Sequence, residues 1–242
     1  MKQIATLTFV LVSTVLFAQS IEKKVGSFNK IIASPKINLV LVEGTEESVK
    51  INYANVDASK IRVTVKNKTL RIYLDGSRFT EKRERVQLDG EVRKENVYRH
   101  ASITAYVTYN KLQKLVVRGE QEVDVRGPIS GKKFKLSAYG ECDITLASLD
   151  AGKFKASLYG QHTLKIKSGQ VDTQQYKLFG ENKIDALAIQ SVDAYSTTYG
   201  ESKLKVNANE NLRLVTFGES DVWMRGNAEV NKITLGEVSF KK

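Results

Sequence analysis

One short motif recurs seven times in the second half of the chain, and its spacing constrains the fold more than any other feature of the sequence. Each copy has a glycine, usually with an aromatic residue before it and a glutamate after it, followed by alternating apolar residues. The glycines lie at intervals of 21, 20, 20, 20, 18 and 18 residues: Gly119, Gly140, Gly160, Gly180, Gly200, Gly218 and Gly236. A nearly constant period of this length is typical of solenoids, in which similar coils of chain stack on one another.

The residues around each glycine alternate between apolar and polar, as in a strand with one buried face. Four residues after the glycines stand Val123, Ile144, Leu164, Ile184, Leu204, Val222 and Phe240. Every copy runs in the same order, whereas an up-and-down antiparallel sheet would reverse alternate copies. The sequence therefore predicts an all-β fold, a right-handed parallel β-helix with about 20 residues per coil.

The N-terminal half is less regular, and the predicted organisation follows from that contrast. Residues 1–19 form a predicted signal peptide, and residues 20–242 form a single solenoid domain. Within it, residues 20–115 supply irregular strands that cap the stack, since solenoids need atypical terminal units. Residues 75–100 are rich in charge and are predicted to form a projecting loop or hairpin, while residues 116–242 form the regular Gly-Glu repeats.

The first residues resemble a secretory signal. Lys2 precedes an apolar run over residues 4–17, and small residues allow cleavage near Ala18 or Gln19. No later stretch has the roughly 20 apolar residues of a transmembrane helix. The prediction is an exported protein without a transmembrane segment, in the periplasm, on the outer-membrane surface or outside the cell.

The formal net charge of +11 bears on partners, and the single cysteine, Cys142, excludes an intramolecular disulfide. In a secretory compartment nucleic acid is not an expected partner, and an anionic envelope polymer fits the charge better. The alternative is that the lysines only keep an exposed sheet soluble and protect its edges. The oligomeric state stays open.

The residues before the glycines form an aromatic column. Its members are Tyr139, Tyr159, Phe179, Tyr199 and Phe217, with Arg118 and Leu235 at the two ends. Stacked rings can stabilise a corner by about 0.5–1.5 kcal/mol per pair. They could also form a ligand face that binds sugar, so a structural and a functional interpretation both remain.

The residues after the glycines form an acidic column. Four of its members, Glu141, Glu181, Glu201 and Glu219, are weak candidates for Ca²⁺ ligands, because calcium takes oxygen ligands. One carboxylate per coil is sparse for a calcium site, and the glutamates could instead accept corner N–H groups or face solvent. We therefore predict no metal site and no cofactor.

No catalytic constellation is recognisable. Cys142 and His162 would be neighbours on adjacent coils, but no third orienting group accompanies them. An acid/base cluster for a polysaccharide lyase or hydrolase could be assembled from Asp143, Lys165, Lys183 and Asp185. That alternative rests on analogy with other β-helices, which is weak evidence of function.

Several segments together resemble the head GIN domain family, a group of exported Bacteroidetes proteins described as adhesins. The resemblance rests on the Phe28-Asn29-Lys30-Ile31 opening, the Ile37-Asn38-Leu39-Val40-Leu41 and Leu70-Arg71-Ile72 strands, and the Gly-Glu repeats. It covers most of residues 25–242 and implies a non-enzymatic envelope protein. The expected function is an adhesin or binding scaffold for a glycan, an envelope polymer or a protein. The alternatives are a polysaccharide lyase or hydrolase and a structural envelope component.

Overall fold

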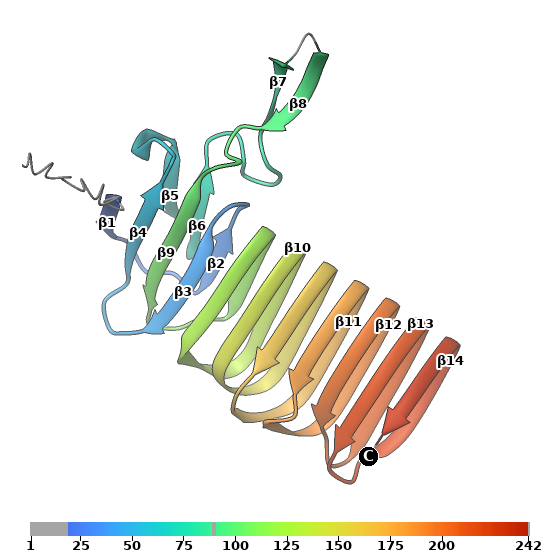
Figure 1. Cartoon of the computed structure of the whole chain (residues 1–242). Coiled ribbons are helices and arrows are strands. Elements are labelled where there is room, and N and C mark those ends of the chain that lie inside the picture. Colours follow the sequence, from blue (N-terminus) through green and yellow to red (C-terminus); the bar gives the residue numbers. More distant parts are fainter. Residues whose placement is uncertain (1–18, 89–90, 242) are drawn as a thin grey trace, which may run out of the picture.

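The repeats form a stack of parallel coils, as predicted. The structure is a computed structural model that describes residues 19–88 and 91–241. Residues 1–18 of the predicted signal peptide therefore lie outside the described residues. Five long strand segments pair in sequence order along the stack (Figure 1): β10 (Lys114–Ile166), β11 (Gly169–Ala186), β12 (Ile189–Asn207), β13 (Asn211–Arg225) and β14 (Glu229–Lys241). Each coil holds roughly 20 residues.

The register of these coils places like residues beside like. Gly160 pairs with Gly180, and the same column continues through Gly200, Gly218 and Gly236. All of these pairings are parallel. The period of the sequence is therefore the number of residues in one coil.

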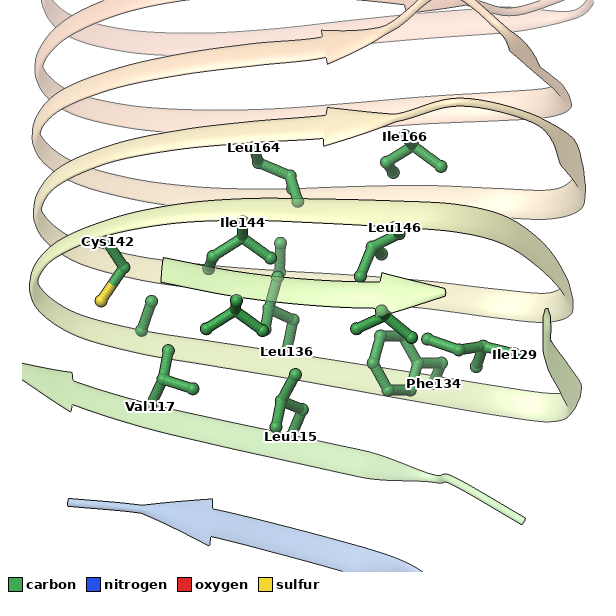
Figure 2. Close-up of a cluster of buried hydrophobic side chains, with 14 of the residues drawn as sticks. Leu115, Val117, Ile129, Phe134, Leu136, Cys142, Ile144, Leu146, Leu164 and Ile166 are labelled. Carbon is green, nitrogen blue, oxygen red and sulfur yellow. The ribbon is translucent and has the colours of Figure 1, made fainter. Parts of the chain in front are cut away.

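The apolar residues that precede and follow each glycine face one another across the interior of the coil. Figure 2 shows Leu136 on one wall and Ile144 on the other, both directed into the same core. The next coil contributes Leu164 and Ile166, and all four side chains are at most 2% exposed. The core is thus continuous along the stack and is made of stacked columns of similar residues.

A short third ladder explains the change of period. Leu149 pairs with Gly169, and Gly169 pairs with Ile189. These coils therefore have an extra paired segment between the strand that follows one glycine and the strand that precedes the next. The pairing between β12 and β13 begins only at Asp193 and Asn211. Without the short ladder a coil closes in fewer residues, which accounts for the intervals of 18.

The N-terminal strands form two further coils. β2 (Lys30–Ala33) and β3 (Asn38–Glu43) pair in parallel with β10, and β6 (Thr69–Leu74) and β9 (Ser102–Tyr109) pair in parallel with β2 and β3. These coils lack the corner glycine. Pro35 takes its place against Gly119, whose added Cβ would lie 2.9 Å from the Pro35 Cβ.

Antiparallel strands close this end of the stack. β5 (Ile61–Lys66) pairs with β6, β4 (Ser48–Ala54) pairs with β9, and β1 (Gln19–Lys24) pairs with β4. One 3-10 turn, η1 (Ala58–Lys60), precedes β5. No helix in the described part of the chain is long and apolar enough to cross a membrane.

The charged segment interrupts the coil between β6 and β9. β7 (Arg83–Leu88) and β8 (Glu91–Asn96) form an antiparallel hairpin that projects from the stack (Figure 1). Its base is fixed to the coils: the Ser34 hydroxyl donates to the Arg78 carbonyl at 2.7 Å, and the Tyr98 hydroxyl donates to the Asp75 carbonyl at 2.8 Å. The hairpin therefore emerges where the other coils turn their corner.

Candidate functional site: a glycine corner between aromatic rings and carboxylates

At the glycine corner the backbones of successive coils lie too close together to admit a side chain. Gly200 has φ +114°, and a Cβ on it would lie 2.6 Å from the carbonyl oxygen of Gly180. That distance is inside van der Waals contact, and the backbone conformation is one that residues with a Cβ rarely adopt. The corner is thus a ridge of backbone, with the side chains of the flanking residues on its two sides.

On one side of the ridge the rings form the aromatic ladder, defined as Tyr139, Tyr159, Phe179, Tyr199 and Phe217. Successive ring centroids are 5.1, 4.8, 4.9 and 4.9 Å apart, and no pair of planes is inclined by more than 9°. Stacking of this kind stabilises the corner. Because each ring covers the face of the next, the solvent meets the ring edges and the tyrosine hydroxyls rather than free ring faces.

The ladder continues beyond its first ring towards the hairpin. The guanidinium carbon of Arg118 lies 4.6 Å from the centroid of Tyr139 and 5.5 Å from that of Phe79. Arg78 in turn lies 5.7 Å from Phe79 and 5.8 Å from Tyr73. The sequence pattern did not identify Phe79 or Arg78, because both lie in the irregular charged segment. Its one signal was Arg118, which occupies the ladder position of the first copy.

On the other side of the ridge the glutamates line the carboxylate groove. One hollow of this groove, about 220 Å³, is bordered by carboxylates of successive coils: Glu181, Glu201, Glu219, Asp221 and Glu237. Two further hollows, of about 130 and 350 Å³, continue it past Glu141 to Glu120. Lys183 and Lys203 also line it, and Lys183 Nζ lies 3.8 Å from Glu181 Oε1.

The four candidate calcium ligands, Glu141, Glu181, Glu201 and Glu219, all lie in this groove with exposed side chains. Within residues 19–88 and 91–241, no three His, Cys, Asp or Glu side chains are grouped closely enough to hold one metal ion. The structure therefore brings these glutamates into one row but does not gather them into a coordination shell.

Beneath the groove runs a buried polar column formed by the second residue after six of the corner glycines. It consists of Gln121, Cys142, His162, Asn182, Ser202 and Ser220. The Ser202 and Ser220 hydroxyls are 2.8 Å apart, and the Cys142 thiol donates to the Gly119 carbonyl at 3.3 Å. Burial raises the pKa of Cys142 to about 12, so this thiol stays protonated at neutral pH and is a poor nucleophile.

His162 is the one titratable ring in that column. It is 3% exposed, and neither of its ring nitrogens has a hydrogen-bond partner among the described residues. Desolvation lowers the pKa of His162 below its usual 6.5, although the nearby Tyr159 carbonyl and the Asp143 carboxylate favour the cation. At neutral pH the ring is therefore an uncharged part of the packing.

The burial of His162 predicts a loss of stability in mild acid. Below about pH 6.5 the unfolded chain binds a proton on this ring that the folded protein excludes, so protonation favours unfolding. We expect the melting temperature to fall as the pH decreases from 7 to 5, and His162→Asn to weaken that dependence. Asn182 already occupies the paired position on the next coil, so asparagine suits the site.

The control for this prediction is His100→Asn, which makes the same change on an exposed side chain. Melting curves of the three proteins at several pH values test it. An equal pH dependence in His162→Asn and the unmutated protein would contradict the prediction.

The four residues proposed for lyase or hydrolase chemistry do not form one cluster. Asp143 and Lys183 line the same small hollow with Glu141 and Thr163. Lys165 and Asp185 are paired across adjacent coils on the outer face and do not line that hollow. The arrangement supplies charged side chains along a groove, without a nucleophile that has a recognisable base and orienting group.

A family model matches this chain over residues 27–228, and its description is "Putative auto-transporter adhesin, head GIN domain". The matched range includes the hairpin, the corner glycines up to Gly218, and the whole aromatic ladder. No match among curated proteins was found.

Solved structures share the fold. A putative adhesin from Bacteroides fragilis has a TM-score of 0.74 and 18% sequence identity, with 94% of this chain and 98% of that chain covered. A putative adhesin from Parabacteroides merdae has a TM-score of 0.64 at 14% identity, covering 93% and 96% of the two chains. A putative lipid binding protein from Parabacteroides distasonis has a TM-score of 0.61 at 14% identity, with the same coverage. At these identities the likeness shows the fold alone.

Proposed function

Since the chain belongs to the auto-transporter adhesin family with a head GIN domain, we propose that it is an exported, non-catalytic adhesin that binds an extended, uncharged glycan along its glycine corner. The binding role in general follows from the family. The ligand class and the place of binding are argued from the corner itself.

The observation that carries the proposal is the row of polar groups along each side of the ridge, which is interrupted on the aromatic side by Phe179. Tyr139, Tyr159 and Tyr199 are 36–43% exposed, and their hydroxyls can both donate and accept. The carboxylates of the groove add acceptors at the spacing of the coils, about 4.8 Å. A polymer with many hydroxyls can satisfy such a row at several successive positions.

The stacking of the rings limits the ways in which a sugar can contact them. Because the ring faces are occupied by one another, a sugar cannot stack flat on the interior rings. It can lie along their edges and exchange hydrogen bonds with the tyrosine hydroxyls and the glutamates. An anionic polymer is a poor candidate for this side, since the carboxylates outnumber Lys183 and Lys203 and would repel it.

The hairpin lies at one end of the row formed by the aromatic ladder. Phe79 is 62% exposed and lies against Arg118, which itself stacks on the first ring of the aromatic ladder. An extended ligand that follows the ladder would thus meet the base of the hairpin. We propose that the hairpin limits the length of ligand bound, which is consistent with long insertions being functional.

Removal of three hydroxyls tests the proposal. The variant Tyr139→Phe, Tyr159→Phe, Tyr199→Phe keeps every stacked ring and removes only the polar edge. A hydrogen bond contributes about 0.5–1.5 kcal/mol, so three losses are expected to weaken binding at least about tenfold while the melting temperature is retained. Binding is measured on an array of neutral oligosaccharides, namely glucans, mannans and galactans.

The control variant is Tyr195→Phe, which removes the same group from a tyrosine outside the aromatic ladder. Unchanged binding in the triple variant, or no binding of the unmutated protein to any neutral glycan, would contradict the proposal. Release of new sugar ends by the unmutated protein would favour the lyase or hydrolase alternative. Assembly with a partner protein without glycan binding would favour the structural alternative.

A further inference from the structure

A second charged surface lies on the strands that precede the corner, and its sign is opposite to that of the carboxylate groove. Six lysines border a hollow of about 520 Å³: Lys30, Lys111, Lys114, Lys132, Lys133 and Lys135. We call these six the lysine patch. Among the residues that the structure describes, the hollow is otherwise lined by Gln113, Ser130 and Gly131, and no acidic side chain borders it.

Parallel pairing places several of these lysines directly beside one another. Lys30 pairs with Lys114 in the ladder between β2 and β10. The Lys135 backbone N–H donates to the Gln113 carbonyl at 2.9 Å, which puts Lys135 beside Lys114 on the next coil. Lys155 follows on the coil after that, five residues before its own glycine. Like charges on adjacent strands repel, so this column opposes folding rather than supporting it.

No internal counter-charge neutralises the patch. The described residues form ion pairs elsewhere, and none of them involves a lysine of the patch. Asp172 lies beside Gly152, which also lies beside the Lys132 carbonyl, and Asp172 forms no ion pair with a lysine of the patch. Burial lowers the pKa of Lys155, and the neighbouring Lys177, Lys133, Lys135 and Lys153 lower it further, as expected where positive charges crowd together.

From this unneutralised hollow we infer a second binding site, which takes a segment of an anionic polysaccharide bearing carboxylate or sulfate groups. The site is separate from the proposed glycan-binding corner, because the lysine hollow shares no lining residue with the hollows of the carboxylate groove and no ring of the aromatic ladder lines it. A charged polymer fits the row of lysines along the stack, since it can present one anionic group after another to successive coils.

The lining of the hollow distinguishes this ligand from other polyanions. Sites for single-stranded nucleic acid combine positive charge with aromatic residues that stack on bases, and no aromatic side chain lines this hollow. A membrane surface binds flat faces with apolar side chains that enter the headgroup layer, whereas this surface is concave and none of its described lining residues is aliphatic or aromatic. The compact lysine ammonium suits dispersed anionic groups without demanding bidentate geometry.

The test is a comparison of two triple variants that change the net charge equally. Lys114→Gln, Lys133→Gln, Lys135→Gln alters the patch, and Lys23→Gln, Lys50→Gln, Lys165→Gln alters exposed lysines outside both the patch and the carboxylate groove. Binding to dextran sulfate and to polygalacturonate is measured by calorimetry, with dextran as the uncharged reference. We expect the patch variant to bind at least about tenfold more weakly than the unmutated protein, and the control variant to stay within about twofold.

Melting temperature and binding of other polyanions are measured as well. The patch variant should melt no lower than the unmutated protein, because repulsion between lysines is relieved, so lost binding cannot be ascribed to unfolding. Equal weakening by both triple variants would show a dependence on net charge alone and would overturn the site. Tighter binding of phosphatidylglycerol vesicles or of single-stranded DNA than of both polysaccharides, with the same dependence on the patch, would overturn the assigned ligand class.

Discussion

Replacing Gly200 by valine is expected to lower the free energy of unfolding by about 3–5 kcal/mol, a large share of the stability of an ordinary domain. Two effects combine at this corner. The backbone has φ +114°, which a β-branched residue adopts at high cost, and the new Cβ would lie 2.6 Å from the Gly180 carbonyl oxygen. The obstacle is backbone of the preceding coil, so it cannot move aside as a flexible side chain can. A urea unfolding curve measures the change.

Gly26→Val is the matched control for that prediction. A Cβ at Gly26 has no heavy atom within 4 Å, and its φ lies outside the strained positive range. We expect a change of less than about 1 kcal/mol there. Similar urea midpoints for the two variants would contradict the view that the coils meet backbone to backbone at the corner.

Phe154→Ala is expected to cost about 3–5 kcal/mol, because it opens a cavity in the continuous core. Phe154 is fully buried, and its ring centroid lies 5.9 Å from that of Phe134 in a stacked arrangement. It also lies 5.9 Å from Tyr176, at 83°, so it joins two other large buried rings. The polar end of Tyr176 is fixed by Gln174, whose side-chain oxygen accepts its hydroxyl at 2.7 Å, so the neighbours have little freedom to fill the space.

The comparison for Phe154→Ala is the same change at Phe79, which is 62% exposed. Removing that ring is expected to cost less than about 1 kcal/mol. Thermal or urea unfolding of both variants measures the difference. If Phe79→Ala destabilised the protein as much as Phe154→Ala, the assignment of the core to the inward columns would be wrong.

The regular half of the molecule could be predicted closely from its residues. The period predicted the number of residues in a coil, and the alternation predicted which columns of side chains face inward and outward. The recurring glycines marked the position of the corner. The order of residues around each glycine also placed the aromatic ladder and the glutamates on the two sides of one ridge. These inferences succeeded because each coil pairs with its neighbour in a fixed register, so a local pattern repeated along the chain becomes a column in space.

The polar column under the groove was located but its burial was not foreseen. Cys142, His162 and Asn182 each stand two residues after a corner glycine, and only the first two were considered from the sequence, as neighbours on adjacent coils. In the fold they lie inside the corner, at 1–3% exposed, and this burial removes the thiolate chemistry that the sequence left open. Period-two alternation in fact continues through the corner, since Ala138, Cys142 and Ile144 are all buried. The polar character of this column, rather than a change of phase, concealed its burial.

The sequence by itself determined the coil, because stacking of equal repeats needs only local pattern and a constant period. The tertiary structure alone decided how the stack ends and where its charge collects. The antiparallel caps, the contact of Phe79 with Arg118, and the meeting of Lys30 with Lys114 all join segments that are far apart in the chain. Such meetings depend on which strand edges remain unpaired after the regular coils have formed, and no repeat in the chain encodes that outcome.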